Sequence, residues 1–223
     1  MATIETDKAG YVIGQSSTNF STARQNSSSV VAAPTTNQSQ AISYTATSGR
    51  GSLTFNMKRT FLYFDTTAIT GTVSAASLDI SGATNNSADI IVLESTAFGG
   101  NGGTALATSD FFSTIDYSTT YSSIYTSWGA SNTISLNSTA ESAMQTNTAF
   151  ICAIVEYYRD YSNSAGTSVA TKINGIAFGN KITITYTETG AGPFLKLNGV
   201  DSTNISKWDG TSWGSISKIN GIS

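Results

Sequence analysis

Strict alternation between apolar and small polar side chains is the feature that most constrains the fold of this chain. Residues 182–187 read Ile-Thr-Ile-Thr-Tyr-Thr, and residues 53–57 follow a similar pattern. A period of two places successive side chains on opposite faces of a β-strand, so one face can be buried while the other meets water. Ser and Thr together supply about 30% of the residues, which suits polar outer faces. The sequence therefore predicts an all-β protein.

Two denser apolar runs, residues 60–65 and 150–158, are typical of central strands buried on both faces. Clusters of Gly, Asn and Ser, such as residues 82–87 and 99–103, separate the apolar runs. Shorter runs predict further strands at residues 11–13, 29–32, 41–46, 76–80, 89–94 and 133–136. Many short strands with little helix between them predict an antiparallel β-sandwich.

One short helix is predicted over residues 139–145. Asn137 and Ser138 precede it as capping residues, and Glu141 follows Ser138 by three positions, as in a capping box. The segment 104–128 mixes aromatic and hydroxyl side chains, and two interpretations stay open for it: a long surface loop or two more short strands.

Composition argues against several classes of function. Charged residues make up 11% of the chain, the net charge is −3, and Lys and Arg form no cluster, so nucleic acid is not an expected partner. No apolar run is long enough to span a bilayer, and the N-terminus has no apolar signal region. We therefore expect a protein folded in a cytosol, or a mature fragment. The single cysteine, Cys152, is interpreted as a buried small hydrophobe.

Catalytic motifs are missing from the sequence. The chain has no histidine, which excludes Ser-His-Asp and Cys-His chemistry, and it has no phosphate-binding glycine loop. We therefore expect neither an enzyme nor a cofactor. The best carboxylate pair for glycoside hydrolysis is Glu156 with Asp160, but ion pairing with Arg159 or Lys58 is the favoured interpretation of this pair.

Carboxylate-bearing residues of this kind are also candidates for calcium binding. Carboxylate and amide oxygens suit Ca²⁺, and the candidates are Asp160 with Asn163, or Asp89 with Asn86. Their spacing matches no defined calcium loop, so solvated loop polarity is the favoured interpretation and no metal is expected.

Four aromatic residues between the predicted strands form a candidate glycan-binding or interface surface. Exposed Tyr and Trp rings stack on sugars or anchor protein contacts. The alternative, slightly favoured, is that these rings fill the core or a subunit contact. The four are Tyr117, Tyr121, Tyr125 and Trp128.

A family resemblance runs through the central strands. Residues 59–65 and 69–80 resemble the stretch R-x-L-L-x-F-D … I-x-G-x-x-V-x-x-A-x-L-x-[IL] of the DNRLRE-type β-sandwich modules of bacterial surface proteins. Residues 134–137, the predicted helix and residues 150–155 follow the later order of that module. The resemblance covers roughly residues 10–187 and implies a jelly-roll-like sandwich of the carbohydrate-binding-module type.

The motif Lys-[Ile/Leu]-Asn-Gly-[Ile/Val] occurs three times, at residues 172–176, 196–200 and 218–222. Asn-Gly favours tight turns because both residues tolerate positive φ. The first copy is interpreted as an ordinary hairpin turn. The other two frame a Trp-containing segment that follows a Gly-Ala-Gly-Pro linker, so the sequence predicts a sandwich domain at 1–189 and a C-terminal β-hairpin tail at 190–223.

The C-terminal tail, residues 190–223, resembles short Trp-rich and Asn-Gly-rich segments of bacteriophage tail, fibre and capsid-associated proteins, especially those of phages with Bacteroidota hosts. A lone hairpin is marginal in water, so the tail is expected to pack on its own domain or on another chain. The residues expected to make assembly contacts are Leu197, Val200, Ile205, Trp208, Trp213, Ile216, Ile219 and Ile222.

Two functional hypotheses follow from these resemblances. The first is a structural protein of a bacteriophage virion, a decoration or appendage subunit of a head fibre, capsid or tail, assembled in the host cytoplasm. Through its tail it would join other virion proteins and copies of itself, in a homo-oligomer such as a trimer. The alternative is a carbohydrate-binding or adhesin module of a bacterial surface, in which the region of Tyr125 and Trp128 contacts a host glycan.

Overall fold

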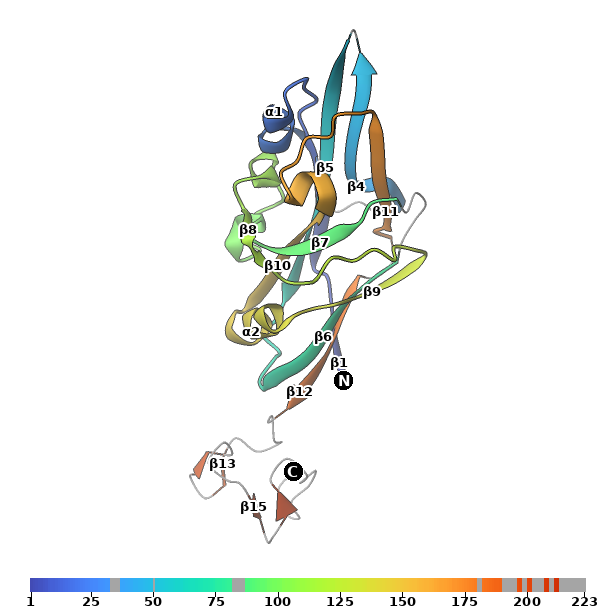
Figure 1. Ribbon diagram of the computed structural model, residues 1–223. Helices are drawn as coiled ribbons and strands as arrows, with labels where there is room; N and C mark the ends of the chain where they lie inside the picture. The colour runs from blue at the N-terminus through green and yellow to red at the C-terminus, as the bar shows by residue number, and fades with distance from the viewer. Residues whose placement is uncertain are drawn as a thin grey trace.

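The computed structural model describes residues 1–32, 37–49, 51–81, 87–179 and 182–189, together with four two-residue strands beyond residue 195. The described residues up to Thr189 fold into two antiparallel β-sheets that pack face to face (Figure 1). The prediction of an all-β antiparallel sandwich is confirmed, whereas the jelly-roll connectivity stays a prediction. Within the described part of the chain, no helix is both long and apolar enough to cross a bilayer.

The smaller sheet has four strands. Their order is β1 (Ala2–Glu5), β12 (Thr183–Thr189), β6 (Thr72–Ser81) and β9 (Ser131–Ser135). The alternating residues 183–187 lie on β12, where Ile184 and Tyr186 are buried and the three threonines are partly exposed. The first and last strands of the sandwich, β1 and β12, pair with each other from Ala2↔Tyr186 to Glu5↔Thr183.

The larger sheet has eight strands arranged around the long strand β5. The main order is β11 (Ala170–Ala177), β4 (Asn37–Gly49), β5 (Ser52–Asp65), β10 (Ala149–Glu156), β7 (Ile90–Ser95) and β8 (Ile115–Thr120), with β2 (Lys8–Gly14) beside β5 and β3 (Ser27–Ala32) beside β2. Lys58 pairs with both Ser43 of β4 and Ile13 of β2, so these two strands lie on opposite edges of β5. β5 is one continuous strand where the sequence predicted two.

Both faces of the larger sheet are buried, and each supports its own hydrophobic cluster. The inter-sheet cluster fills the space against the smaller sheet and includes Leu62, Leu78 and Ile184. The outer cluster lies on the opposite face and includes Phe61 and Phe111. Adjacent residues of β5 therefore point into different clusters, which confirms the prediction that the dense apolar runs form central strands.

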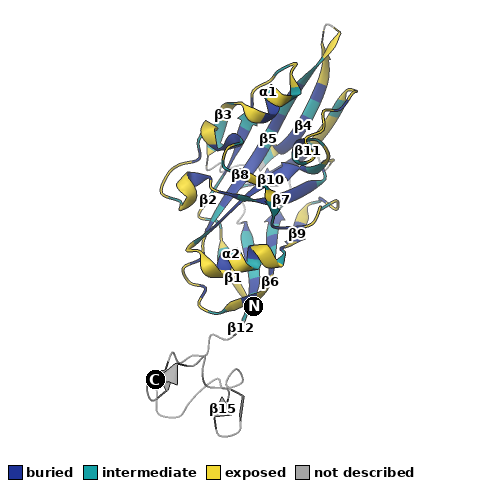
Figure 2. Ribbon diagram, turned by 60° about the vertical axis from the view of Figure 1, so that its left-hand side comes forward, coloured by how far each residue is buried: buried dark blue, intermediate teal, exposed yellow. Residues whose placement is uncertain are grey.

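Short helical elements cover the outer cluster and one end of the sandwich (Figure 2). They are α1 (Phe20–Gln25), two 3-10 turns, η1 (Phe98–Gly100) and η2 (Thr108–Phe111), α2 (Ser138–Thr146), and a π-helical turn, η3 (Tyr157–Tyr161). The predicted helix is confirmed as α2, but its N-cap is Asn137, whose Oδ1 accepts from the Ala140 N–H at 3.1 Å. For the segment 104–128, a long loop and two short strands were the two interpretations, and the structure has one strand there, β8.

Cys152 is fully buried on β10 among inter-sheet residues, as predicted. Burial raises the pKa of its thiol, because the thiolate would lose its hydration there.

The Asn-Gly copy at residues 172–176 is not a hairpin turn, so that prediction is wrong. These residues lie within β11, and the pairing of β11 with β4 shifts register between Asn174 and Ile176. One residue separates these two pairs on β11 and three residues, 39–41, separate them on β4, so the bulge lies on β4 and β11 stays a continuous strand. The buried Asn174 side chain donates to the Ala88 carbonyl at 2.7 Å and accepts from the Ala88 N–H at 3.0 Å.

Candidate functional site

A cluster of buried polar side chains lies on the outer face of the larger sheet. Arg59 of β5 is 0% exposed, and its Nε and Nη2 donate to the two carboxylate oxygens of Asp160 at 2.6 Å each. Nη2 also donates to the Arg24 carbonyl at 2.8 Å, and Nη1 donates to the Phe111 carbonyl. The Phe111 ring lies 3.9 Å from the guanidinium carbon. Arg59 therefore joins β5 to α1, η2 and η3 through one side chain.

Asp160 has a second arginine beside it. Arg24 of α1 donates from Nε to the Asp160 carbonyl at 2.8 Å, and the same nitrogen lies 3.4 Å from a carboxylate oxygen. The Arg24 guanidinium in turn lies over the Tyr117 ring, at 4.4 Å from its centroid. This arrangement neutralises the carboxylate inside the protein, which buried charges require.

Glu156 closes the turn that carries Asp160. Its buried carboxylate accepts from the backbone N–H groups of Tyr158, Arg159 and Asp160 at 3.1, 2.7 and 3.2 Å. Burial raises the pKa of Glu156, and the three N–H donors only partly offset that effect. Arg159 and Lys58 were the expected ion-pair partners of Glu156 and Asp160, and this expectation is wrong. Asp160 pairs with Arg59 and Arg24 instead. Neither carboxylate faces a groove.

Among the described residues, none of the calcium candidates belongs to a cluster of acidic side chains. Asp160 is occupied by the two arginines, and Asn86 lies outside the described residues. Over the ranges that the structure describes, no group of three or more His, Cys, Asp or Glu side chains is close enough to hold an ion.

The four predicted aromatic residues lie in two different places. Tyr121 and Trp128 are 3% and 5% exposed and belong to the inter-sheet cluster, against which the half-buried Tyr125 packs. Tyr121 stacks on Phe150 with ring centroids 4.9 Å apart, and Tyr125 meets Trp128 edge-on at 6.4 Å. Tyr117 packs on the opposite face of the larger sheet. The structure therefore does not bring the four rings onto one exposed surface.

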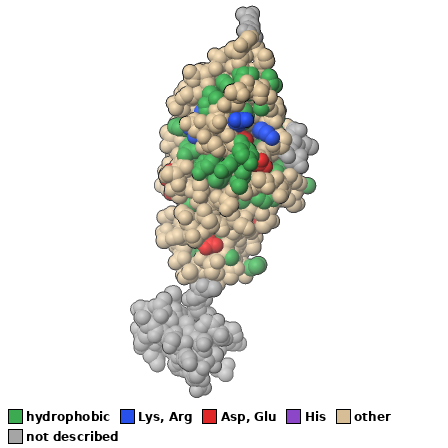
Figure 3. All heavy atoms as spheres, viewed as in Figure 1, with side chains coloured by type: hydrophobic (Ala, Val, Ile, Leu, Met, Phe, Trp, Pro, Cys, Tyr) green, Lys and Arg blue, Asp and Glu red, His purple; other side chains and the backbone are tan. Residues whose placement is uncertain are grey.

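The surface itself carries few charges. On the face in Figure 3, uncharged polar side chains and backbone cover most of the area, with Lys, Arg, Asp and Glu in small patches around an apolar region.

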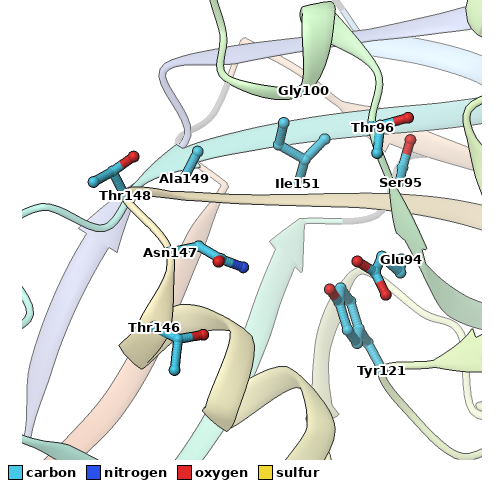
Figure 4. Close-up of a pocket in the computed structure, with 10 residues that line it drawn as sticks. All are labelled: Glu94, Ser95, Thr96, Gly100, Tyr121, Thr146, Asn147, Thr148, Ala149 and Ile151. Carbon is cyan, nitrogen blue, oxygen red and sulfur yellow. The ribbon is translucent and has the colours of Figure 1, made fainter.

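The site with the most varied chemistry is a cavity of about 460 Å³, here called the β7–α2 pocket (Figure 4). It is lined by Glu94, Ser95, Thr96, Gly100, Tyr121, Thr146, Asn147, Thr148, Ala149 and Ile151. Two of these residues are candidates from the sequence: Tyr121 as an interface aromatic and Glu94 as one of several carboxylates. The others carry no motif, because they come from four separate segments of the chain.

The strand pairing explains why a pocket forms at this place. β7 pairs with β10 only from Glu94↔Cys152 onward, so the start of β10 at Ala149 has no β7 partner. The pairing of β7 with β8 also breaks its register between Leu93 and Glu94. Such irregularities end a ladder and redirect side chains. The space left beside β10 is closed by the end of α2, and Figure 4 shows the Glu94, Tyr121 and Asn147 side chains directed into it.

In the C-terminal tail, the structure describes two pairs of short strands. β13 (Lys196–Leu197) pairs with β14 (Val200–Asp201), and β15 (Lys207–Trp208) pairs with β16 (Thr211–Ser212). Of the predicted assembly residues, Leu197, Val200 and Trp208 lie in these strands. The others lie outside the described residues: Ile205, Trp213, Ile216, Ile219 and Ile222. The predicted hairpin tail as a whole stays a prediction.

The register of these strand pairs reveals a repeat that the Asn-Gly motif alone did not. In each pair, the first and second strand residues face the sixth and fifth, and the intervening dipeptide is Asn-Gly or Asp-Gly. Lys207 follows Lys196 by 11 residues, and Lys218 follows Lys207 by 11 residues. The repeat that begins at Lys207 does not match the motif, because Trp208, Asp209 and Thr211 replace its second, third and fifth residues. The tail is thus built on an 11-residue period, to which the copy at 172–176 does not belong.

No protein-family model matches this chain, and no curated protein matches its sequence. The resemblances to DNRLRE-type modules and to phage tail segments therefore rest on the residues quoted for them, and the function drawn from them is a proposal.

Proposed function

We propose that this chain is a structural subunit of a bacteriophage virion, a decoration or appendage protein that is incorporated through its C-terminal tail. The observation that supports this most is the pairing between the first and last strands of the sandwich. The sandwich is closed by the pairing of its first strand, β1, with its last strand, β12, and β12 ends at Thr189, next to the tail. Both sheets of the sandwich are built from strands that lie at or before Thr189.

The described strands of the tail, in contrast, are too short to be stable by themselves. Each of its described strands is two residues long, and hairpins this small are marginally stable in water. Short tandem repeats gain stability when neighbouring units stack, and at least three are usually needed. Two full 11-residue repeats and part of a third make up residues 196–223. Repeats from a second copy of the chain, or a strand edge on another virion protein, would supply the missing neighbours.

The test is incorporation into particles. A chain that ends at Thr189 is expected to fold but to be absent from purified particles, whereas the full chain is present by mass spectrometry. Trp208→Ser, within a tail strand, should reduce incorporation, and Tyr158→Ser, on the exposed surface of the sandwich, serves as the matched control. Equal incorporation of the truncated and full chains would refute attachment through the tail.

The alternative function, a carbohydrate-binding or adhesin module, was expected to use the Tyr125 and Trp128 region. A stacking platform needs an exposed ring face, and Trp128 is packed in the inter-sheet cluster. The observation that favours glycan binding is a different one, the β7–α2 pocket.

A further inference from the structure

We propose that the β7–α2 pocket binds a neutral sugar residue. Its volume of about 460 Å³ lies within the usual range of about 300–1,000 Å³ for small-molecule sites. Hydroxyl, amide and carboxylate groups surround it, and the apolar side chains of Ala149 and Ile151 contribute to its wall. A sugar ring has this same mixture, with hydroxyl groups at its edge and C–H groups on its faces. The site is separate from the tail, so it adds a binding activity to the structural role.

Two polar groups in the pocket are close together and yet do not bond to each other. The Glu94 carboxylate makes no hydrogen bond or ion pair with any described residue, and neither does the Tyr121 hydroxyl. Burial raises the pKa of Tyr121, and the negative charge of Glu94 raises it further, which shows their proximity. Figure 4 shows the hydroxyl and the carboxylate side by side at the pocket.

A ligand hydroxyl can bond to the Tyr121 hydroxyl and to the Glu94 carboxylate at the same time. It accepts a hydrogen bond from the Tyr121 hydroxyl and donates one to the Glu94 carboxylate. Hydrogen bonds to a carboxylate are stronger than those between neutral groups, so Glu94 should provide most of the affinity. The Asn147 side chain, directed toward them in Figure 4, offers one acceptor and two donors for a neighbouring hydroxyl.

Other ligand classes fit less well. The charge of Glu94 repels a phosphate or a carboxylate. A divalent cation needs more oxygen ligands than one carboxylate, and the described residues hold no acidic cluster here. An ammonium group has only donors, so it would leave the Asn147 amide hydrogens without an acceptor. A neutral polyhydroxyl compound matches every group that lines the pocket.

Binding can be tested with the full-length chain by saturation-transfer NMR, using glucose, galactose, mannose and N-acetylglucosamine as separate probes. At least one should bind, in the millimolar range that is common for a single sugar in an open site. Glu94→Gln should weaken that sugar by about tenfold or more, through the lost charge-assisted hydrogen bond. Asn147→Ala should weaken it less.

The matched control is Glu141→Gln, the same chemical change on α2 but outside the pocket lining. It should leave sugar binding unchanged. Thermal unfolding of each variant confirms that the sandwich remains folded. Failure of all four sugars to bind would overturn the proposal, as would a sugar whose affinity is the same in wild type and Glu94→Gln. Stronger binding of glucuronate than of glucose would also overturn it, because the site would then select a negative charge.

Discussion

Asp160→Ala is expected to lower the free energy of unfolding by about 3–5 kcal/mol, because it leaves the charge of Arg59 buried without its partner. Arg59 is completely buried, and two of its hydrogen bonds, both at 2.6 Å, go to the Asp160 carboxylate. A loss of this size is a large part of the 5–15 kcal/mol that stabilises a typical domain. Urea unfolding followed by circular dichroism measures it directly.

Asp65→Ala is the control for this experiment. Asp65 ends β5, its carboxylate is exposed, and among the described residues its side chain bonds to Thr67 alone, two residues away. Its removal should leave the urea midpoint almost unchanged. The double variant Arg59→Met with Asp160→Leu should be much more stable than Asp160→Ala alone, since it removes both charges together. Equal destabilisation by Asp65→Ala and Asp160→Ala would contradict a stabilising role for the buried pair.

Trp128→Ala should have an effect of similar size, about 3–5 kcal/mol, because it leaves a large cavity between the sheets. The ring is almost fully buried in the inter-sheet cluster and meets Tyr125 edge-on. A Trp that served as an exposed sugar platform would instead be removable with little loss of stability. Circular dichroism during urea unfolding therefore distinguishes the two roles.

Tyr158→Ala provides the comparison for Trp128. Tyr158 is 51% exposed and contacts the Tyr157 ring at the surface. Its removal should cost less than about 1 kcal/mol, as is usual for surface substitutions. If Trp128→Ala is no less stable than Tyr158→Ala, the ring does not support the core and the platform interpretation regains its basis.

The features that could be predicted from the sequence are those that depend on local periodicity. Residues 183–187 of the alternating run lie in β12, and residues 60–65 and 150–156 of the dense runs lie in central strands of the larger sheet, whereas Tyr157 and Tyr158 begin η3. The capped helix over 139–145 formed as α2, because the Asn137 cap is a local signal. Each of these predictions depended only on neighbouring residues.

The features that sequence reasoning missed depend on contacts between distant segments. Arg59 and Asp160 are separated by 101 positions, and no local pattern indicates that they meet. The Asn-Gly at residues 174–175 has strong turn chemistry, yet it lies inside β11 and faces a bulge of β4. In the β7–α2 pocket, Glu94, Tyr121 and Asn147 come from three segments, so only the register break of β7 brings them together.

The central claim is that an independently folded sandwich is followed by a tail that makes the assembly contacts. Light scattering and thermal unfolding of the chain truncated after Thr189, compared with the full chain, test this most directly. We expect the truncated chain to unfold cooperatively at the temperature of the full-length sandwich and to be monomeric, while the full chain forms a homo-oligomer. A truncated chain that fails to fold, or that keeps the oligomeric state of the full chain, would contradict the account.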